Sequence, residues 1–226
     1  GRFYIYETIT NGETVTNEEP DEWNKGIASF DVVCKKAKEN DVAVLIDGEE
    51  SWMQDAADEL VLEMMRRYNK EKAIVHNTLQ LYRHDRLAYL KKIEKIALTE
   101  HFYIGVKIVR GAYMEKEQER AQENGIPSPI CISKEATDNN FDTTLRYCLE
   151  HLDRITVFIG THNEASTYLA LDIMNELEIQ CHDTRVWFGQ LYGMSDHISF
   201  NLAKEGYNVA KYLPFGPVRD VMPYLI

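Results

Sequence analysis

The sequence lacks the features that mark several classes of protein. No apolar stretch approaches the ~18 residues that a membrane-spanning helix needs, and the start, GRFYIYETITNGETV, has no basic region followed by an apolar run. We therefore expect neither a transmembrane segment nor a signal peptide. Basic residues are few, because 25 Lys and Arg face 37 Asp and Glu, for a net charge of -12. This charge repels phosphate backbones and excludes a nucleic-acid partner.

Cysteine is also scarce, and the motifs of several enzyme classes are missing. The four cysteines form no C-x-x-C pair, which predicts free thiols in a reducing compartment, either the cytoplasm or an organelle matrix. No H-E-x-x-H or comparable ligand spacing occurs, so we expect no metal. There is no G-x-S-x-G motif for an acyl-transfer nucleophile. The cysteines are Cys34, Cys131, Cys148 and Cys181.

Short apolar runs alternate with helical patterns along the whole chain, which has neither an internal repeat nor a Pro/Gly linker. Residues 1–226 therefore read as a single domain. Apolar strands between helices predict a parallel sheet covered on both faces. The strand candidates are 42–47, 72–78, 103–113, 154–163, 184–194 and 208–216. The helix candidates are 20–39, 51–69, 83–99, 114–124, 135–152, 164–178, 195–205 and 217–225.

Two features favour a barrel over an open sheet. No G-x-G-x-x-G follows the first strand, so the nucleotide-binding fingerprint of the open fold is missing. Nearly every strand candidate ends in polar groups, and a barrel gathers these ends around one mouth. We predict an α/β (β/α)8 barrel of the TIM type. Because six strand candidates are seen rather than eight, either strands have been missed or the barrel is incomplete at both termini. The strand-end residues include Asp47, Asn77, Gln80, Arg110, Thr161, His162, Asn163, Gln190 and Tyr212.

Individual strand-end residues allow a structural and a functional interpretation. Asp47 is either a helix N-cap or an acid in the mouth. Lys107 stands inside an apolar run, where a lysine is costly unless it is paired or lies beside a ligand, and we favour a functional role. Gly111 either lets a ligand approach the backbone or serves a tight turn. His162 is either a structural histidine or, at a helix N-terminus, a contact to a phosphate or ring oxygen.

Five segments, in order and each at a strand end, resemble the proline dehydrogenase family: LIDGEES (45–51), TLQLYRHDRL (78–87), VKIVRGAYMEKE (106–117), GTHN (160–163) and QLYGM…KYLPFG…PYL (190–225). The resemblance implies FAD on a modified (β/α)8 barrel. It implies oxidation of L-proline to 1-pyrroline-5-carboxylate by hydride transfer to FAD, with a membrane quinone as the electron acceptor. The expected location is the cytoplasm, at the periphery of the inner membrane, for a bacterial protein, and the mitochondrial matrix side for a eukaryotic one.

The resemblance also implies roles for single residues. Gln80 would hydrogen-bond the flavin ring, and Lys107 would lie beside flavin N5, where a cation stabilises the reduced ring. Asp47 would lie near the substrate amine, so Asp47 and Lys107 are the predicted catalytic residues. The predicted cofactor-binding residues are Gly48, Gln80, Lys107, Arg110, Gly111, Ala112, Thr161, His162, Asn163 and Gln190. The predicted walls of the proline site, besides Asp47, are Tyr113, Leu191, Tyr212 and Tyr224.

Two family features have no counterpart in this sequence. A pair of arginines that clamps the proline carboxylate usually follows Tyr-Leu-x, but here the chain stops at Ile226. A substrate-side lysine on an early strand is also missing, so we expect a truncated chain that binds flavin and proline weakly. Two alternatives stay open: a barrel fragment without catalytic activity, and a metal-free lyase or aldolase that uses Lys107 as a Schiff-base amine.

Overall fold

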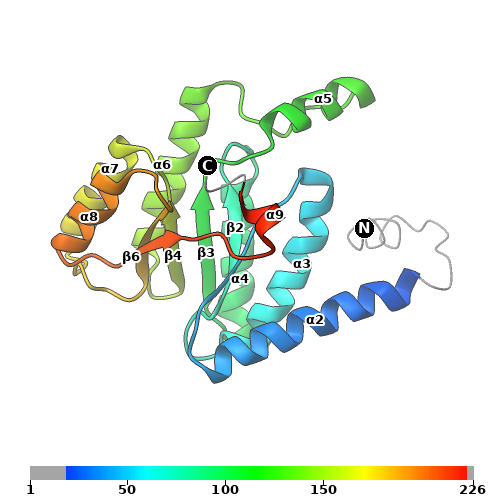
Figure 1. Ribbon diagram of the computed structural model, residues 1–226, viewed down its shortest axis with the longest axis horizontal. Coiled ribbons are helices and arrows are strands. Elements are labelled where there is room, and N and C mark those ends of the chain that lie inside the picture. The colour runs from blue at the N-terminus through cyan, green and yellow to red at the C-terminus, as the bar shows by residue number, and fades with distance from the viewer. Residues whose placement is uncertain (1–18, 223–226) are drawn as a thin grey trace.

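Strands and helices alternate through residues 19–222, the part of the chain that the computed structural model describes (Figure 1). The strands are β1 (Val44–Ile46), β2 (Val75–Gln80), β3 (Ile104–Val109), β4 (Ile155–Gly160), β5 (Val186–Leu191) and β6 (Val209–Tyr212). The helices are α2 (Glu19–Glu39), α3 (Ser51–Tyr68), α4 (Arg86–Glu100), α5 (Met114–Asn124), α6 (Lys134–Glu150), α7 (Glu164–Glu176), α8 (Asp196–Lys204) and α9 (Val218–Val221).

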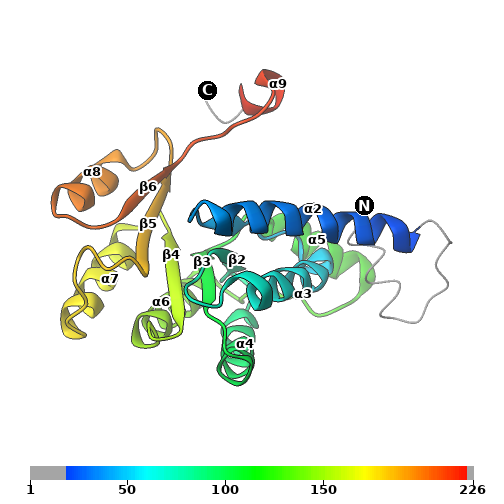
Figure 2. The same cartoon turned by 90° about the horizontal axis from the view of Figure 1, so that it is seen from below.

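The six strands form one parallel sheet in the order in which they occur along the chain. Figure 2 shows the sheet curling, with α3, α4, α6 and α7 along its convex side. A parallel strand must return through a crossover, and here each crossover places a helix on the same side of the sheet. The described part of the chain is therefore part of a (β/α)8 barrel, and the predicted fold class is confirmed.

The hydrophobic core lies between the convex face of the sheet and the helices. In β4, Ile155, Val157 and Ile159 are fully buried, whereas the residues between them are half-buried. Successive side chains of a strand point to opposite faces, so the second set lies on the concave face. Phe158 of that set is in register with Lys107 on β3. On the concave face Lys107 therefore lies between Phe158 of β4 and Thr78 of β2.

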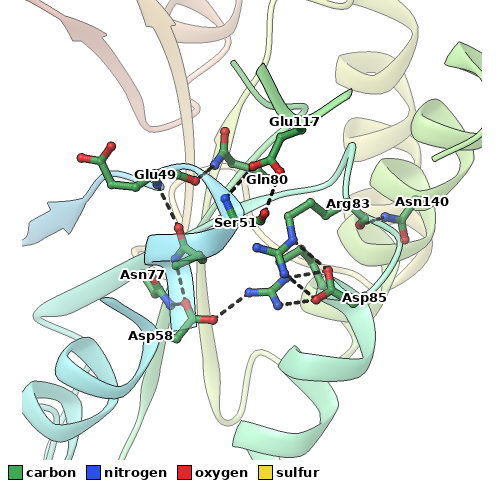
Figure 3. A network of polar contacts seen from close by, with 11 residues as sticks. Glu49, Ser51, Asp58, Asn77, Gln80, Arg83, Asp85, Glu117 and Asn140 are labelled. Atoms are coloured by element: carbon green, nitrogen blue, oxygen red, sulfur yellow. Dashed lines mark hydrogen bonds and ion pairs between the residues drawn. The ribbon is translucent and has the colours of Figure 1, made fainter. Parts of the chain in front are cut away.

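A buried polar network fixes α3 against the sheet and α4. Asp58 of α3 accepts hydrogen bonds from Asn77 Nδ2 of β2 at 2.8 Å and from Arg86 Nη1 of α4 at 2.7 Å. Gln54, one turn earlier on α3, also donates to Asp58 and accepts from the backbone N–H of Glu49 at 2.9 Å. This network reaches the loop after β1, so the position of that loop depends on α3 (Figure 3).

The six predicted strands and eight predicted helices are all found, with shifts of a few residues at their ends, and residues 223–225 of the last predicted helix lie outside the described part of the chain. Helix α2 packs against α3. The four cysteines are free thiols, as expected. No helix among residues 19–222 has the length and apolar character needed to cross a membrane.

Candidate functional site

The two residues predicted to be catalytic form an ion pair at the carboxyl ends of the strands. Lys107 of β3 is in register with Thr78 and Phe158, which places its side chain on the concave face. Its ammonium group pairs with the carboxylate of Asp47, which follows β1. The lysine side chain is 15% exposed and the aspartate 58%. A shielded cation thus lies on the concave face, beside an acid that is open to solvent.

Gln80 joins the loop after β1 to the loop after β3 (Figure 3). Its Nε2 donates to the carbonyl of Glu49 at 2.8 Å, and its Oε1 accepts from the backbone N–H of Ala112 at 3.1 Å. A Cβ at Gly48 would lie 3.0 Å from Gln80 Nε2, so a glycine lets the loop approach this closely. The two contacts use one of the two N–H groups of the amide and one of its two oxygen lone pairs.

Arg110, directly after β3, reaches across to α6 and α7. Its Nε donates to Asp138 at 2.7 Å, its Nη1 to Thr161 Oγ1 at 3.0 Å and its Nη2 to Ser166 Oγ at 3.0 Å. The guanidinium lies over the ring of Phe141, 4.5 Å from the centroid. These contacts fix a cation between two strand ends and engage three of its five N–H groups. Within residues 19–222, the other two have no protein partner.

The backbone turns sharply at Gly111, which has a φ of +133°. A side chain there would collide with the ring of Tyr82, because a Cβ would come within 2.2 Å of it. Only glycine adopts this conformation readily. The predicted tight turn is therefore present at Gly111, and it brings Ala112 N–H to Gln80.

Thr161 and Asn163 shape the start of α7. Asn163 is the N-cap, and its side-chain oxygen accepts from the backbone N–H of Ser166 at 3.0 Å. Thr161 is buried, and its Oγ1 accepts from both Arg110 and the backbone N–H of Asn163. A helix N-terminus carries partial positive charge, so this strand end is suited to an anion.

His162 and Gln190 differ in their surroundings. The Nδ1 of His162 lies 2.9 Å from Ser195 Oγ, and partial burial together with the charge of Lys211 lowers the pKa of this imidazole. Gln190 is buried: its Nε2 donates to the carbonyl of Thr161 at 3.2 Å, and its Oε1 accepts from Ser199 at 2.8 Å. The contacts of Gln190 thus tie β5 to α8 and to the end of β4.

The predicted apolar walls belong to two separate parts of the mouth. Leu191 and Tyr212 are register partners at the ends of β5 and β6, and they are 44% and 56% exposed. Tyr113 is half-buried at the start of α5, where burial and the charge of Glu49 raise the pKa of its hydroxyl. Tyr224 lies outside the described residues.

Glu49, in the LIDGEES segment after β1, has a raised pKa because it is partly buried and lies near the carboxylates of Glu50 and Asp47. Three residues that hold the site were not singled out from the sequence. Asp138 and Ser166 hold Arg110, and Ser199 holds Gln190. Only Ser166 had a sequence signal, since it stands three residues after an N-cap asparagine. Among residues 19–222, no cluster of three or more His, Cys, Asp and Glu side chains is arranged to hold a metal ion.

The whole sequence from residue 6 to 226 matches the family model described as Proline dehydrogenase. Human "Proline dehydrogenase 1, mitochondrial" is 41% identical over 213 residues, which are 93% of this chain and 36% of that protein. The Drosophila melanogaster protein of the same name is 38% identical over 88% of this chain and 31% of its own length. "Carbapenem antibiotics biosynthesis protein CarD" of Pectobacterium carotovorum is 39% identical over 90% of this chain and 52% of its own length.

The fold is also found in a solved structure. Proline utilization A (PutA) from Bdellovibrio bacteriovorus, inactivated by N-propargylglycine, matches with a TM-score of 0.82 and 25% sequence identity. The match covers 91% of this chain and 21% of that one. The present chain spans about a third to a half of the length of these three curated relatives. On the family match and these identities, the chain belongs to the proline dehydrogenase family.

Proposed function

We propose that this chain provides the catalytic barrel of an FAD-dependent proline dehydrogenase, which oxidises L-proline to 1-pyrroline-5-carboxylate. The observation that carries the proposal is the Lys107–Asp47 pair on the concave face of a family barrel. Lys107 lies beside Phe158 on the concave face, where a flat ring could pack, and Asp47 is exposed enough to meet a small amine. We also propose that residues 1–226 belong to one barrel domain.

The donor set of the mouth fits FAD, which carries a flat ring system and an anionic diphosphate. Arg110 and the N-terminus of α7 supply positive charge at one strand end. The Gly111 turn keeps side chains away from the backbone there, and Lys107 supplies the second cation. The residues proposed to hold FAD are Gly48, Gln80, Lys107, Arg110, Gly111, Ala112, Thr161, His162, Asn163 and Gln190. When bound, FAD supplies the acceptor for a hydride and its two electrons.

The side chains of the barrel then orient proline and exclude water. Asp47 accepts a hydrogen bond from the proline amine, and Tyr113, Leu191, Tyr212 and Tyr224 enclose the ring. Carbon C5 of proline loses a hydride while its nitrogen loses a proton, and a C5=N double bond forms. Lys107 offsets the negative charge that develops opposite C5, an electrostatic role that requires the ammonium to be in place beforehand.

We further propose that the electrons pass to a membrane quinone, as in the family in general. The names of the human and Drosophila relatives place those proteins in mitochondria, which supports a matrix-side location for a eukaryotic source. For a bacterial source the proposal is the cytoplasm, with transient contact at the inner membrane.

The proposal is tested by the absorbance of the purified chain with added FAD, before and after proline, without oxygen. Flavin bands near ~450 nm should appear and should bleach when proline is added. In Lys107→Met the bands should remain, but bleaching at saturating proline should be roughly 10²-fold slower, because a preformed charge is lost. Lys38→Met is the matched control, since Lys38 of α2 forms an ion pair with Glu71 in the loop before β2, at the opposite end of the strands from the mouth.

Three other outcomes would count against this proposal. A chain that stays colourless with excess FAD would be a barrel without flavin chemistry. Bound flavin that proline does not bleach would remove the substrate assignment. Borohydride trapping of a carbonyl compound on Lys107, absent in Lys107→Met, would instead establish Schiff-base chemistry.

A further inference from the structure

Glu117 on α5 is a buried carboxylate that the proposed reaction does not use. It is 1% exposed, and a buried carboxylate is costly unless hydrogen bonds compensate for the lost water. Its two oxygens accept from the backbone N–H of Ser51 at 2.5 Å and from Ser51 Oγ at 2.6 Å (Figure 3). One serine thus satisfies both oxygens of the buried group.

Ser51 is the first residue of α3, and this helix does not cap its own N-terminus. The N-cap residue, Glu50, makes no side-chain capping hydrogen bond, and the first turn of α3 contains no acid. The first N–H groups of a helix have no partner within the helix and favour a negative charge nearby. Glu117 supplies both the acceptor and the charge from a different helix, so α3 and α5 depend on each other at this point.

The contact lies at the far ends of two loops that reach the mouth. Ser51 comes four residues after Asp47, and Glu117 comes four residues after Tyr113. The same two loops are joined nearer the mouth by Gln80, which bonds Glu49 and Ala112. An ion pair between the exposed Lys116 and the buried Glu50, at 2.9 Å, lies beside the Glu117 contact. The two loops are therefore joined at both ends, and Glu117 makes the more deeply buried of the two outer contacts.

We propose that Glu117 is a positioning residue that sets the distance between the loop carrying Asp47 and the loop carrying Tyr113. The inference rests on the proposed function, in which these loops hold the two sides of the proline ring. Glu117 touches neither proline nor flavin in this scheme and acts through Ser51. A displacement of about 1 Å between groups that orient a substrate costs up to ~10²-fold in rate, so the contact matters for the hydride step.

The test compares two variants of Glu117 with an exposed acid on the same helix. Glu117→Ala removes both acceptors, whereas Glu117→Gln can accept from the Ser51 N–H and donate to the Ser51 hydroxyl, which is both donor and acceptor. Glu119→Gln is the control, because Glu119 lies on the exposed side of α5. The first readout is amide hydrogen exchange without FAD, in the segments 47–53 and 110–117. A Ser51→Ala variant, alone and with Glu117→Ala, measures the coupling of the two side chains.

Amide exchange should rise in both segments in Glu117→Ala, while the strands of the sheet keep their protection. Adding Ser51→Ala to Glu117→Ala should raise the exchange only slightly further. The second readout is anaerobic flavin reduction by proline. Glu117→Ala should keep its FAD and lose at least roughly tenfold in limiting reduction rate. Glu117→Gln should recover most of this loss.

A general rise of exchange across the sheet, or the same rates in Glu117→Ala and Glu119→Gln, would overturn the inference. If proline fails to reduce even the unaltered protein, the proposed function fails, and the exchange data still decide whether Glu117 joins the loops.

Discussion

At the residue scale, His76 shows how burial alone controls a titratable group. It lies on β2, is 4% exposed and packs so closely on Gly105 that a Cβ there would come within 2.6 Å of its ring. Its Nδ1 lies 3.3 Å from the carbonyl of Ile74. Burial penalises the charged imidazolium and lowers the pKa of His76 to about 4. The ring is therefore neutral in the folded protein at neutral pH.

This pKa makes stability depend on pH. An unfolded chain protonates His76 below about pH 6.5, whereas the folded chain does so only near 4. The unfolded state thus binds more protons between these values, so stability is complete above 6.5 and falls as pH drops towards 4. The loss attributable to His76 is about 3 kcal/mol. Urea unfolding between pH 7.5 and 4 should show a shallower pH dependence for His76→Asn.

His101→Asn is the matched control for that experiment. His101 is exposed and ends α4 in the left-handed region, which asparagine tolerates. Its pH dependence should equal that of the unaltered chain. If His76→Asn also keeps the original slope, then carboxylates rather than His76 cause the acid sensitivity.

At the element scale, α3 is the helix whose placement reaches the site most directly. Its buried Asp58 accepts hydrogen bonds from Arg86 of α4 and Asn77 of β2. Both side chains of the Arg86–Asp58 pair are shielded from water. Leaving one member of a buried ion pair without its partner is far more costly than losing a surface pair. The network beyond Asp58 runs through Gln54 to the loop that carries Asp47 and Gly48.

Replacing Asp58 by Asn should therefore lower the free energy of unfolding by about 3 kcal/mol. The new amide N–H group would face the Arg86 guanidinium, which is itself only a donor. Asp55→Asn, an exposed aspartate one turn earlier on α3, should change the unfolding free energy by less than about 0.5 kcal/mol. Equal midpoints for the two variants in a urea titration would show that Arg86 is satisfied by Asp85 alone.

The elements themselves could be predicted because each has a local signal. The strand candidates were short apolar runs bounded by helical patterns, and β4, with its alternating burial, is a clear case. Their order in the sheet follows from the rule that sequential parallel strands become neighbours. The end of each strand has no such local signal: the predicted strand 103–113 includes the polar turn at Arg110 and Gly111, whereas β3 ends at Val109.

The site could be predicted only in part. Asp47 and Arg110 were identified as polar residues directly after apolar runs and Lys107 as a lysine inside one, and the structure pairs Asp47 with Lys107. Gln190 and Leu191 are adjacent, so their side chains point to opposite faces of β5, and the roles predicted for them remain predictions. Glu117 could not be found, because its helix, 114–124, carries many acids and the partner Ser51 is 66 residues away in sequence.

At the scale of the whole molecule, the carboxyl ends of all six strands lie together at the mouth of the barrel. Asp47 follows β1 and Tyr212 ends β6, with Lys107, Arg110 and Thr161 between them. A ligand that contacts several of these ends would connect elements that are far apart in sequence. Binding to the folded state alone stabilises it by mass action, so the global unfolding transition should respond to FAD.

We therefore expect FAD to raise the melting temperature of this chain. At a free concentration of about 100 times Kd the gain is ~2.7 kcal/mol, which corresponds to roughly 5–10 °C for a domain of this size. The measurement is thermal unfolding followed by circular dichroism, with and without FAD.

Arg110→Met should shrink the FAD-dependent shift, because it removes the cation held between the ends of β3 and β4. Arg146→Met, which removes an exposed ion pair with Glu176 on the outer helices, should leave the shift unchanged. Equal shifts in the two variants would remove Arg110 from the proposed cofactor site. No shift in the unaltered chain would contradict FAD binding by the mouth as a whole.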